Sequence, residues 1–303
     1  MATVVARSVR YEEFGPASVL HIVDREIADP APGKVRIAVR AVGLNPADFK
    51  VRNGDKPEWN PTLPAGIGRE LAGVVEAIGD GATLVNVGDE VFGNVAGSAL
   101  AEYVLTNPAN LAHKPAALDW TLAGSLSTVG QTANSSVESQ YLGAGDTVLV
   151  SAAAGGVGVV ASQLALRTGA RVIGTASPSN HAFLESLGVI PVAYGDDLVE
   201  RLREFGPFTA VLDNHGPDTI EAAIALGVPL DRINSIAVEP DVYGTQGVGR
   251  GPIDTAVLEH LADLIVAGEL VLPIEKVYPL DEVIAAFEHL EGGHARGKIV
   301  VEV

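Results

Sequence analysis

The feature that most constrains the fold is a stretch in the middle of the chain, residues 146–163, with the sequence DTVLVSAAAGGVGVVASQ. Val148–Val150 form a short apolar run rich in branched side chains, which is typical of a buried parallel strand. Small residues and a glycine pair follow, and the pattern from Val157 to Arg167 predicts a helix that ends at Gly169. A strand, a tight glycine turn and a helix together present free backbone N–H groups to a phosphate.

The small residues of this turn match a dinucleotide-binding fingerprint, with Ala152, Gly155 and Gly158 at its three positions. Gly155 would let the backbone approach a pyrophosphate, and Gly158 would let the helix pack close to the strand. A second apolar strand at residues 171–175 completes a βαβ unit. Two alternatives stay open: an uncharged membrane-spanning helix over residues 147–166, and a βαβ unit that binds no ligand. The glycine pair and the polar residues of the stretch argue against the first, and glycine at both critical positions argues against the second.

The composition limits the class of protein. A chain of 303 residues is long enough for two domains, and 47% hydrophobic with 19% charged residues indicates a folded chain. The net charge of −18 weighs against nucleic acid or an anionic membrane as a partner. Without cysteine there is no disulfide, thiolate nucleophile or Cys-ligated zinc. The N terminus lacks the pattern of a signal peptide, so the expected location is the cytoplasm.

The order of patterns along the chain predicts two kinds of domain. Residues 1 to about 120 contain short β-type runs separated by Pro and Gly turns, which suggests a barrel. Helices are predicted next, at residues 118–125 and 131–142. From residue 146 strands and helices alternate, as in a doubly wound α/β domain. The strands are predicted at 147–151, 171–175, 190–193, 209–212 and 232–237, and the helices at 157–168, 179–187, 198–204, 220–226 and 255–267. A last strand at 298–303 is expected to rejoin the N-terminal barrel.

Five segments spread over nearly the whole chain carry a family resemblance. They are residues 41–54, which contain Asn45-Pro46-Ala47-Asp48; residues 68–79, leading to 87–93; residues 130–133; the glycine turn with Gln163; and residues 292–300. Together they resemble the zinc-independent branch of the medium-chain dehydrogenase/reductase superfamily, the quinone oxidoreductase or zeta-crystallin-like proteins. The resemblance implies a GroES-like β-barrel catalytic domain over residues 1–121, completed by 272–303. It also implies a Rossmann domain with a doubly wound parallel sheet over residues 122–271.

The departures from relatives concern the metal and the fine specificity. Zinc-dependent relatives have Cys where Asn45 stands and His where Arg69 stands, and their four-Cys structural loop is absent, so no metal is expected. The family often has Val before a glycine where this chain has residues 212–216, and often Lys near the position of Asn180. The quinone-reductase signature also has Lys, Arg or Ser where Leu166 lies. These positions affect the substrate and cofactor assignments, not the fold.

A dinucleotide site without a metal, a thiol or a nucleophile triad indicates hydride transfer. Hydride delivery to a simple ketone places full negative charge on one oxygen, which zinc or a strong acid normally stabilises. A quinone or an α,β-unsaturated carbonyl spreads that charge, so neutral hydrogen-bond donors can be sufficient. The sequence therefore predicts an NADPH-dependent reductase with a small-molecule quinone or enone as substrate. The alternative that stays open is a non-catalytic NADPH-binding redox sensor or crystallin-like protein.

The catalytic residues are predicted in the first of the five segments. Asn45 could donate from its amide near the nicotinamide, or it could only satisfy its own Asn-Pro turn. Lys50 could protonate or hold the enolate if it is buried, or it could be a solvated surface lysine. Asp48 is expected to orient Lys50 or Arg52 more than to act as the acid. Many family members have Tyr near Lys50, so water also stays open as the proton donor.

NADPH is predicted in preference to NADH. An NAD-selective site places a carboxylate at the end of the second strand, and residues 174–180 contain none. Ser177 and Asn180 can donate to a 2′-phosphate, and Tyr194 matches a tyrosine of the family on the same side; a plain polar loop stays open as the alternative. The remaining residues expected to bind the cofactor are Thr128, Ala154, Gly155, Gly156, Val157, Gly158, Asn214 and Lys298.

A homodimer is also predicted. The family commonly pairs through the last strand of its nucleotide domain, and residues 270–277 are taken as that strand. The stretch is apolar and would leave an exposed sheet edge in a monomer, which a two-fold partner would cover. Leu272→Lys is expected to weaken such a dimer by burying a charge at the seam.

Overall fold

The computed structural model describes residues 3–59, 61–249 and 251–303. The chain divides into two compact units, which we call the strand-rich unit (Met1–Thr128, Ile253–Glu269 and Pro273–Val303) and the parallel-sheet unit (Val129–Pro252 and Leu270–Leu272). The division falls inside helix α2 (Trp120–Glu138). The sequence predicts two helices in this region, and that prediction is wrong. Gly130 lies within one continuous helix, because a single glycine costs a helix only about 1 kcal/mol relative to alanine.

The strand-rich unit contains two sheets. One has the order β2-β1-β4, and the other has the order β15-β16-β3-β5-β6-β8, with β7 also paired to β3. The strands are β1 (Val4–Tyr11), β2 (His21–Ile27), β3 (Val35–Gly43), β4 (Ala65–Gly66), β5 (Glu70–Ile78), β6 (Glu90–Asn94), β7 (Tyr103–Thr106), β8 (Leu111–His113), β15 (Ile274–Pro279) and β16 (Lys298–Glu302). The helices wholly within this unit are α1 (Pro46–Asn53), α8 (Thr255–Val266) and α9 (Val283–Glu291).

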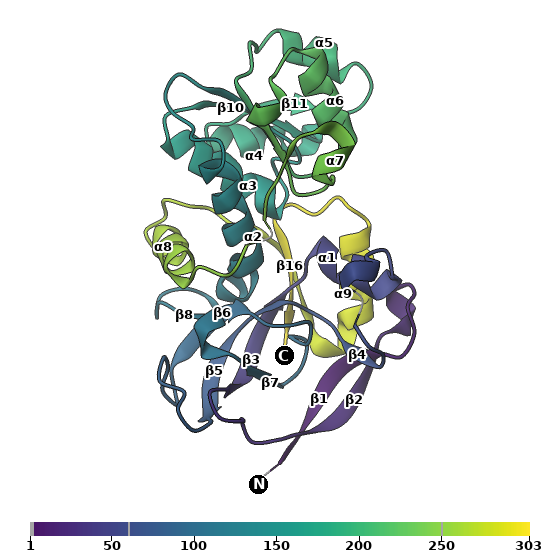
Figure 1. Ribbon diagram of the computed structural model, residues 1–303, viewed down its shortest axis with the longest axis vertical. Helices are drawn as coiled ribbons and strands as arrows, with labels where there is room; N and C mark the ends of the chain where they lie inside the picture. The colour runs from purple at the N-terminus through teal and green to yellow at the C-terminus, as the bar shows by residue number, and fades with distance from the viewer. Residues whose placement is uncertain (1–2, 60, 250) are drawn as a thin grey trace. The chain divides into compact units, whose positions relative to one another are not determined.

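The last strand returns to the N-terminal part of the chain, as its apolar pattern predicts. β16 pairs antiparallel with β3, where Val300 faces Gly43 and Val301 faces Val42. In Figure 1 the yellow C-terminal strand lies among strands drawn in purple and blue. The core between the sheets is formed by branched aliphatic side chains that the two ends of the chain contribute, among them Val35, Ile37, Leu71, Ile299 and Val301. The fold of this unit therefore requires both ends of the sequence.

The parallel-sheet unit has a single six-stranded sheet with the order β11-β10-β9-β12-β13-β14, and every pair is parallel. The strands are β9 (Thr147–Val150), β10 (Arg171–Ala176), β11 (Ile190–Ala193), β12 (Ala210–Asp213), β13 (Ile233–Ser235) and β14 (Gln246–Gly247). The helices are α3 (Gly156–Arg167), α4 (His181–Ser186), α5 (Leu198–Arg203), α6 (Pro217–Ala225) and α7 (Pro240–Tyr243). The strand order reverses between β9 and β12, and ligands of such sheets bind at that reversal, beyond the carboxyl ends of the strands.

Residues 147–166, the alternative membrane-spanning helix, do not form one helix but contain β9, a turn and most of α3. Within the described residues, no helix is both long and apolar enough to span a bilayer.

The expected dimer seam at residues 270–277 is not a strand of the parallel sheet. Residues 270–272 pack in the parallel-sheet unit, where Gln163 donates to the Val271 carbonyl and accepts from the Val271 N–H, both at 2.8 Å. Ile274 then begins β15, which pairs with β16 in the other unit. Leu272 is buried, so Leu272→Lys would destabilise the fold itself and would not report on a dimer. The edge strands of the parallel sheet are β11 and β14.

Candidate functional site

The glycine turn between β9 and α3 has the geometry of a phosphate cradle. Gly155 is the N-cap of α3, and the N–H groups of the first helical turn have no helical acceptor. A Cβ atom at Gly158 would lie 2.2 Å from the Ala152 carbonyl oxygen, so only glycine allows this close approach of helix and strand. Ala152 itself has φ of 46°, a left-handed conformation that is unusual for alanine. The structure thus brings the predicted cofactor residues 154–158 together in one turn.

A second polar group lies at the ends of β10 and β11. These strands end side by side, because Ala176 pairs with Ala193. Ser177 follows β10 and accepts a hydrogen bond from Asn180 Nδ2 at 3.1 Å, while Tyr194 follows β11 with 53% of its surface exposed. The predicted residues Ser177, Asn180 and Tyr194 therefore come from one edge of the sheet.

The sequence reasoning missed a cation at this edge. Arg201 of α5 donates from Nε to the Ala193 carbonyl at 3.0 Å, and from Nη2 to the carbonyls of Tyr194 and Gly195 at 3.3 and 3.2 Å. The sequence showed only a helical residue seven positions after Tyr194. The turn between β11 and α5 brings its guanidinium back to the end of the strand.

Asp213 forms a buried polar cluster at the carboxyl end of β12. Its Oδ1 accepts from Ser151 Oγ at 2.7 Å and from the N–H groups of His215 and Gly216 at 3.2 Å each, and its Oδ2 accepts from Ser235 Oγ at 2.6 Å. Because these partners follow or end β9, β12 and β13, the carboxyl group ties three neighbouring strand ends together. The predicted cofactor residue Asn214 donates to the Ser151 carbonyl at 3.0 Å, and its Oδ1 is buried without a hydrogen-bond partner in the described part of the chain.

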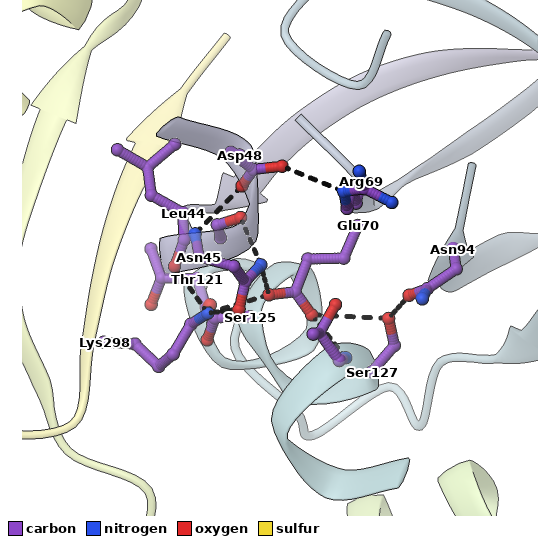
Figure 2. A network of polar contacts seen from close by, with 12 residues as sticks. Leu44, Asn45, Asp48, Arg69, Glu70, Asn94, Thr121, Ser125, Ser127 and Lys298 are labelled. Carbon is purple, nitrogen blue, oxygen red and sulfur yellow. Dashed lines mark hydrogen bonds and ion pairs between the residues drawn. The ribbon is translucent and has the colours of Figure 1, made fainter. Parts of the chain in front are cut away.

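A buried ion pair organises the strand-rich unit. Lys298 Nζ donates to Glu70 Oε1 at 2.8 Å, to Asn45 Oδ1 at 2.7 Å and to the Leu44 carbonyl at 2.7 Å (Figure 2). Both charged side chains are almost completely buried. An ammonium has three donors, and here the protein uses all three. Lys298 can therefore contact a cofactor only by exchanging one of these bonds.

Glu70, which the sequence reasoning missed, is the centre of this network. Its Oε1 also accepts from Asn45 Nδ2 at 2.7 Å (Figure 2). Its Oε2 accepts from the backbone N–H of Thr128 at 2.8 Å. Asn45 Nδ2 reaches the Gly43 carbonyl as well, at 3.3 Å, so the amide that was expected to donate toward a nicotinamide is already committed. The only signal in the sequence was a charged residue at the start of an apolar strand. The side chain of the predicted residue Thr128 keeps a buried Oγ1 with no partner among the residues described.

Asp48 lies beside this network on α1. One carboxyl oxygen accepts the N–H of Asn45 at 2.9 Å, and the other lies 3.7 Å from Arg69 Nε (Figure 2). Burial raises the pKa of Asp48 to about 7, because it outweighs the opposing effects of the Arg69 charge and the Asn45 hydrogen bond. The carboxyl group is thus poised to gain or lose a proton near neutral pH.

The expected partners of Asp48 are wrong. Arg52 pairs with Glu291 at 2.9 Å, and Asp48 faces Arg69 instead. Lys50 is half-buried on the same helix, and its side chain forms no hydrogen bond or ion pair in the described residues. Of the three predicted catalytic residues, the structure brings Asn45 and Asp48 together and leaves Lys50 outside the network.

A cavity of about 620 Å³ lies within the strand-rich unit, and Asp48, Arg69 and Trp59 contribute to its wall. Its volume is in the range of small-molecule sites. Asp48 is the predicted catalytic residue that faces this cavity, since neither Asn45 nor Lys50 lines it.

The residues present do not fit a zinc ion. The position where zinc-dependent relatives have His is Arg69, a permanent cation that cannot bind a metal, and Asn45 is engaged with Glu70 and Lys298. In residues 3–59, 61–249 and 251–303, no group of three His, Cys, Asp or Glu side chains could hold a metal ion.

Two family models match the chain. Residues 31–137 match the alcohol dehydrogenase GroES-like domain, and residues 126–301 match the zinc-binding dehydrogenase family. The second model covers more than half of the chain, and the parallel sheet has the Rossmann strand order. The chain therefore belongs to the medium-chain dehydrogenase/reductase superfamily.

Individual relatives narrow the class. The chain is 31% identical over 310 residues to the NADPH-dependent alkenal/one oxidoreductase of Arabidopsis thaliana. The alignment covers 96% of this chain and 78% of that protein. The quinone oxidoreductase structure from Coxiella burnetii aligns with a TM-score of 0.90 at 32% identity, over 99% of this chain and 100% of that one. The Escherichia coli quinone oxidoreductase complexed with NADPH aligns with a TM-score of 0.87 at 25% identity, over 98% and 100% of the two chains. Within the superfamily, the chain belongs to the quinone oxidoreductase, zeta-crystallin-like, family.

Proposed function

We propose that the protein is an NADPH-dependent reductase of quinones or activated alkenes. The observation that carries this proposal is the glycine turn between β9 and α3, where Gly158 is in contact with Ala152 and the first helical turn keeps free N–H groups. The names of the relatives support it, since one is an NADPH-dependent alkenal/one oxidoreductase and another binds NADPH. In this proposal residues 122–271 bind the dinucleotide, and residues 1–121 with 272–303 form the catalytic domain.

The residues at the sheet edge fit the parts of NADPH. The turn at residues 155–158 offers backbone donors for the pyrophosphate. Ser177, Asn180 and Tyr194 offer polar groups for the 2′-phosphate, and Arg201 adds a positive charge to the same edge. The unpartnered oxygens of Thr128 and Asn214 are further candidates for contacts with the cofactor. When bound, NADPH supplies a hydride.

We assign the role of proton donor to Asp48 in place of Lys50. An acceptor that has taken up a hydride carries negative charge on its conjugated oxygen and needs one proton. Asp48 lines the cavity and holds a proton for part of the time at neutral pH, and Arg69 can stabilise the carboxylate left after transfer. Asn45, Glu70 and Lys298 act as positioning residues, because they hold the N terminus of α1 on which Asp48 lies.

The test uses the N-cap of α3. Gly155→Asp places a carboxylate against the pyrophosphate, while aspartate remains a good N-cap residue, so NADPH binding should fall at least a hundredfold without loss of the fold. Gly155→Asn is the matched control, since it has the same shape and no charge. Equal NADPH titrations for Gly155→Asp and wild type would contradict the proposal. Gly158→Val is less informative, because its side chain would overlap the Ala152 backbone and unfold the turn itself.

Cofactor choice gives a second test. NADPH should be preferred over NADH by at least about tenfold in kcat/KM, equivalent to about 1.4 kcal/mol. Arg201→Gln should reduce that preference, and Arg201→Lys should keep most of it. Equal kcat/KM values for the two cofactors in the wild-type protein would refute the assignment of this edge to a 2′-phosphate.

Turnover separates the enzyme from its alternative. NADPH oxidation with a panel of quinones and enones should be measurable and should persist in the presence of a chelator. A non-catalytic redox sensor or crystallin-like protein would bind NADPH and consume none. One zinc per chain in an active preparation would refute the metal-free mechanism.

A homodimer and a cytoplasmic location complete the proposal. The parallel sheet has β11 and β14 as its edge strands, and an edge strand is a natural place for pairing, so β11 or β14 is the proposed seam in place of residues 270–277. Light scattering at micromolar concentration should give twice the chain mass, and a single species at 31.2 kDa would contradict the dimer.

A further inference from the structure

The cavity of the strand-rich unit has a charge opposite to that of the whole protein. Its wall contains three arginines, Arg10, Arg25 and Arg69, and a single acid, Asp48. The protein as a whole has a net charge of −18. A wall on which cations outnumber acids, in a protein this acidic, favours an anionic ligand at that place.

Arg10 and Arg25 lie on the same face of the β1–β2 hairpin. The register pairs Ala6 with Arg25 and Arg10 with His21, and alternate residues and their cross-strand partners share a face. Arg10 donates to the Pro64 carbonyl, and no acid pairs with Arg10 or Arg25 among the described residues. The pKa of Arg10 is lowered first by burial and then by the charge of Arg25. The two cations therefore repel each other, and a bound anion would relieve that repulsion.

Arg69 and Trp59 form another part of the wall. The Arg69 guanidinium lies 5.4 Å from the centre of the Trp59 ring, and its nearest acid, Asp48, is 3.7 Å away, which is beyond hydrogen-bond distance. Arg69 donates no hydrogen bond within the described part of the chain, so its donors are available to a ligand. Trp59 also has Lys56 Nζ at 5.6 Å from its ring centre, and it is still 42% exposed, so its exposed part offers an aromatic surface for a flat conjugated ring.

We propose that this cavity binds a quinone or enone that carries a carboxylate group, with the carboxylate on Arg10 and Arg25 and the conjugated ring against Trp59. Guanidinium groups match the two oxygens of a carboxylate, and the volume suits a molecule of that size. This inference rests on the proposed function, because it names the substrate class of the same reductase. The carboxylate is assigned from residues of this cavity alone, and the assignment uses neither the glycine turn nor the residues Ser177, Asn180, Tyr194 and Arg201.

The kinetic test compares a 1,4-naphthoquinone carrying a carboxyethyl chain with its methyl ester. The wild-type protein should prefer the acid over the ester by about tenfold in kcat/KM. Arg10→Gln and Arg25→Gln should each reduce this preference several-fold, and Arg10→Lys should retain most of it. The control is Arg40→Gln, which removes the same charge from an exposed position on β3 and should leave the preference at its wild-type value. A wild-type preference near one, or an equal loss in Arg40→Gln, would overturn the proposal.

A binding test without NADPH separates this inference from the proposed function. The chain has two tryptophans, Trp59 and Trp120, so Trp120→Phe leaves Trp59 as the single fluorophore. The quinone acid should quench its emission at lower concentration than the ester does, and Arg10→Gln should remove that difference. If the acid binds in this way but neither compound is reduced, the proposed function fails and the inference stands. If acid and ester bind equally, or if inorganic phosphate binds as tightly as the quinone acid, the inference fails whatever the turnover.

Discussion

Glu70 in the strand-rich unit and Asp213 in the parallel-sheet unit are both fully buried acids, but the protein compensates them differently. Glu70 pairs with a cation, Lys298, that is 228 residues away in the sequence. Asp213 has no ion pair among the described residues and accepts only from hydroxyl and backbone N–H groups, in part from its own turn. The first arrangement joins the two ends of the chain, and the second fixes the ends of neighbouring strands.

The difference shows what each unit requires. The strand-rich unit is assembled from segments that are distant in the sequence. Burying Glu70 or Lys298 without its partner would cost much free energy, so the buried charge pair specifies that β16 lies beside the N-terminal strands. The parallel sheet is built from consecutive βαβ units, so short-range donors are enough to hold its carboxyl edge.

The largest effect is expected from breaking the charge pair. Lys298→Met leaves Glu70 buried without a cation and should lower the free energy of unfolding by about 3–5 kcal/mol. Both tryptophans lie in the strand-rich unit, so urea unfolding followed by tryptophan fluorescence reports on it. The double variant Glu70→Gln with Lys298→Met should recover at least half of the loss. A loss below about 1 kcal/mol in the single variant would mean that the pair does not specify this assembly.

Asp48 sharpens the comparison, because its buried carboxyl group accepts fewer hydrogen bonds than that of Glu70 or Asp213. Its removal in Asp48→Asn should lower kcat for enone reduction by at least about a hundredfold, equivalent to about 2.7 kcal/mol. In the wild-type protein kcat/KM should fall as the pH rises through about 7, the pKa of Asp48, because the protonated form is required. A flat pH profile from 6 to 9 would remove Asp48 from the mechanism.

The same group makes a stability prediction with a definite sign. The pKa of Asp48 in the folded protein lies above the ordinary aspartate value of 3.8, so the folded state binds more protons than the unfolded state between about pH 4 and 7. Its contribution to stability is therefore complete at low pH and is lost as the pH rises through about 7. The advantage of Asp48→Asn over wild type in unfolding free energy should accordingly increase from pH 5 to pH 8, while Asp48→Glu should show no such increase.

A smaller effect is expected at the other buried acid. Asp213→Asn keeps an acceptor for Ser151 and the turn, but it loses the bond to Ser235, because Ser235 Oγ already accepts from the N–H groups of Ala237 and Val238 and cannot accept from the new amide. The substitution should therefore cost about 2 kcal/mol, less than Lys298→Met. Hydrogen exchange of the β12 and β13 amides measures that cost within the parallel-sheet unit. A cost as large as that of Lys298→Met would erase the distinction between the two units.

The smallest effect is expected at Ala152. Replacing it with glycine releases the strain of a left-handed alanine but makes the unfolded chain more flexible, so stability should change by less than about 1 kcal/mol. NADPH affinity should be unchanged within about threefold, because the donors of the first turn of α3 stay in place. A large gain in affinity would show that the strained turn opposes cofactor binding.

The sequence by itself determined the parts of the protein that depend on local backbone structure. The apolar run at residues 148–150, the glycine spacing and the alternation that follows specify a βαβ fold, because strand, turn and helix are each formed by neighbouring residues. The same stretch predicted the close contact at Gly158, since a fingerprint glycine has a single geometric role.

Only the tertiary structure decided which distant side chains meet. Glu70 and Lys298 are 228 positions apart, and no periodicity relates them; their contact exists because β16 returns to pair with β3. The seam assigned to residues 270–277 failed for the same reason, since an apolar strand pattern does not specify which sheet it joins. Arg10 and Arg69 likewise meet only in a folded cavity, because long side chains are brought together by packing and not by their order in the chain.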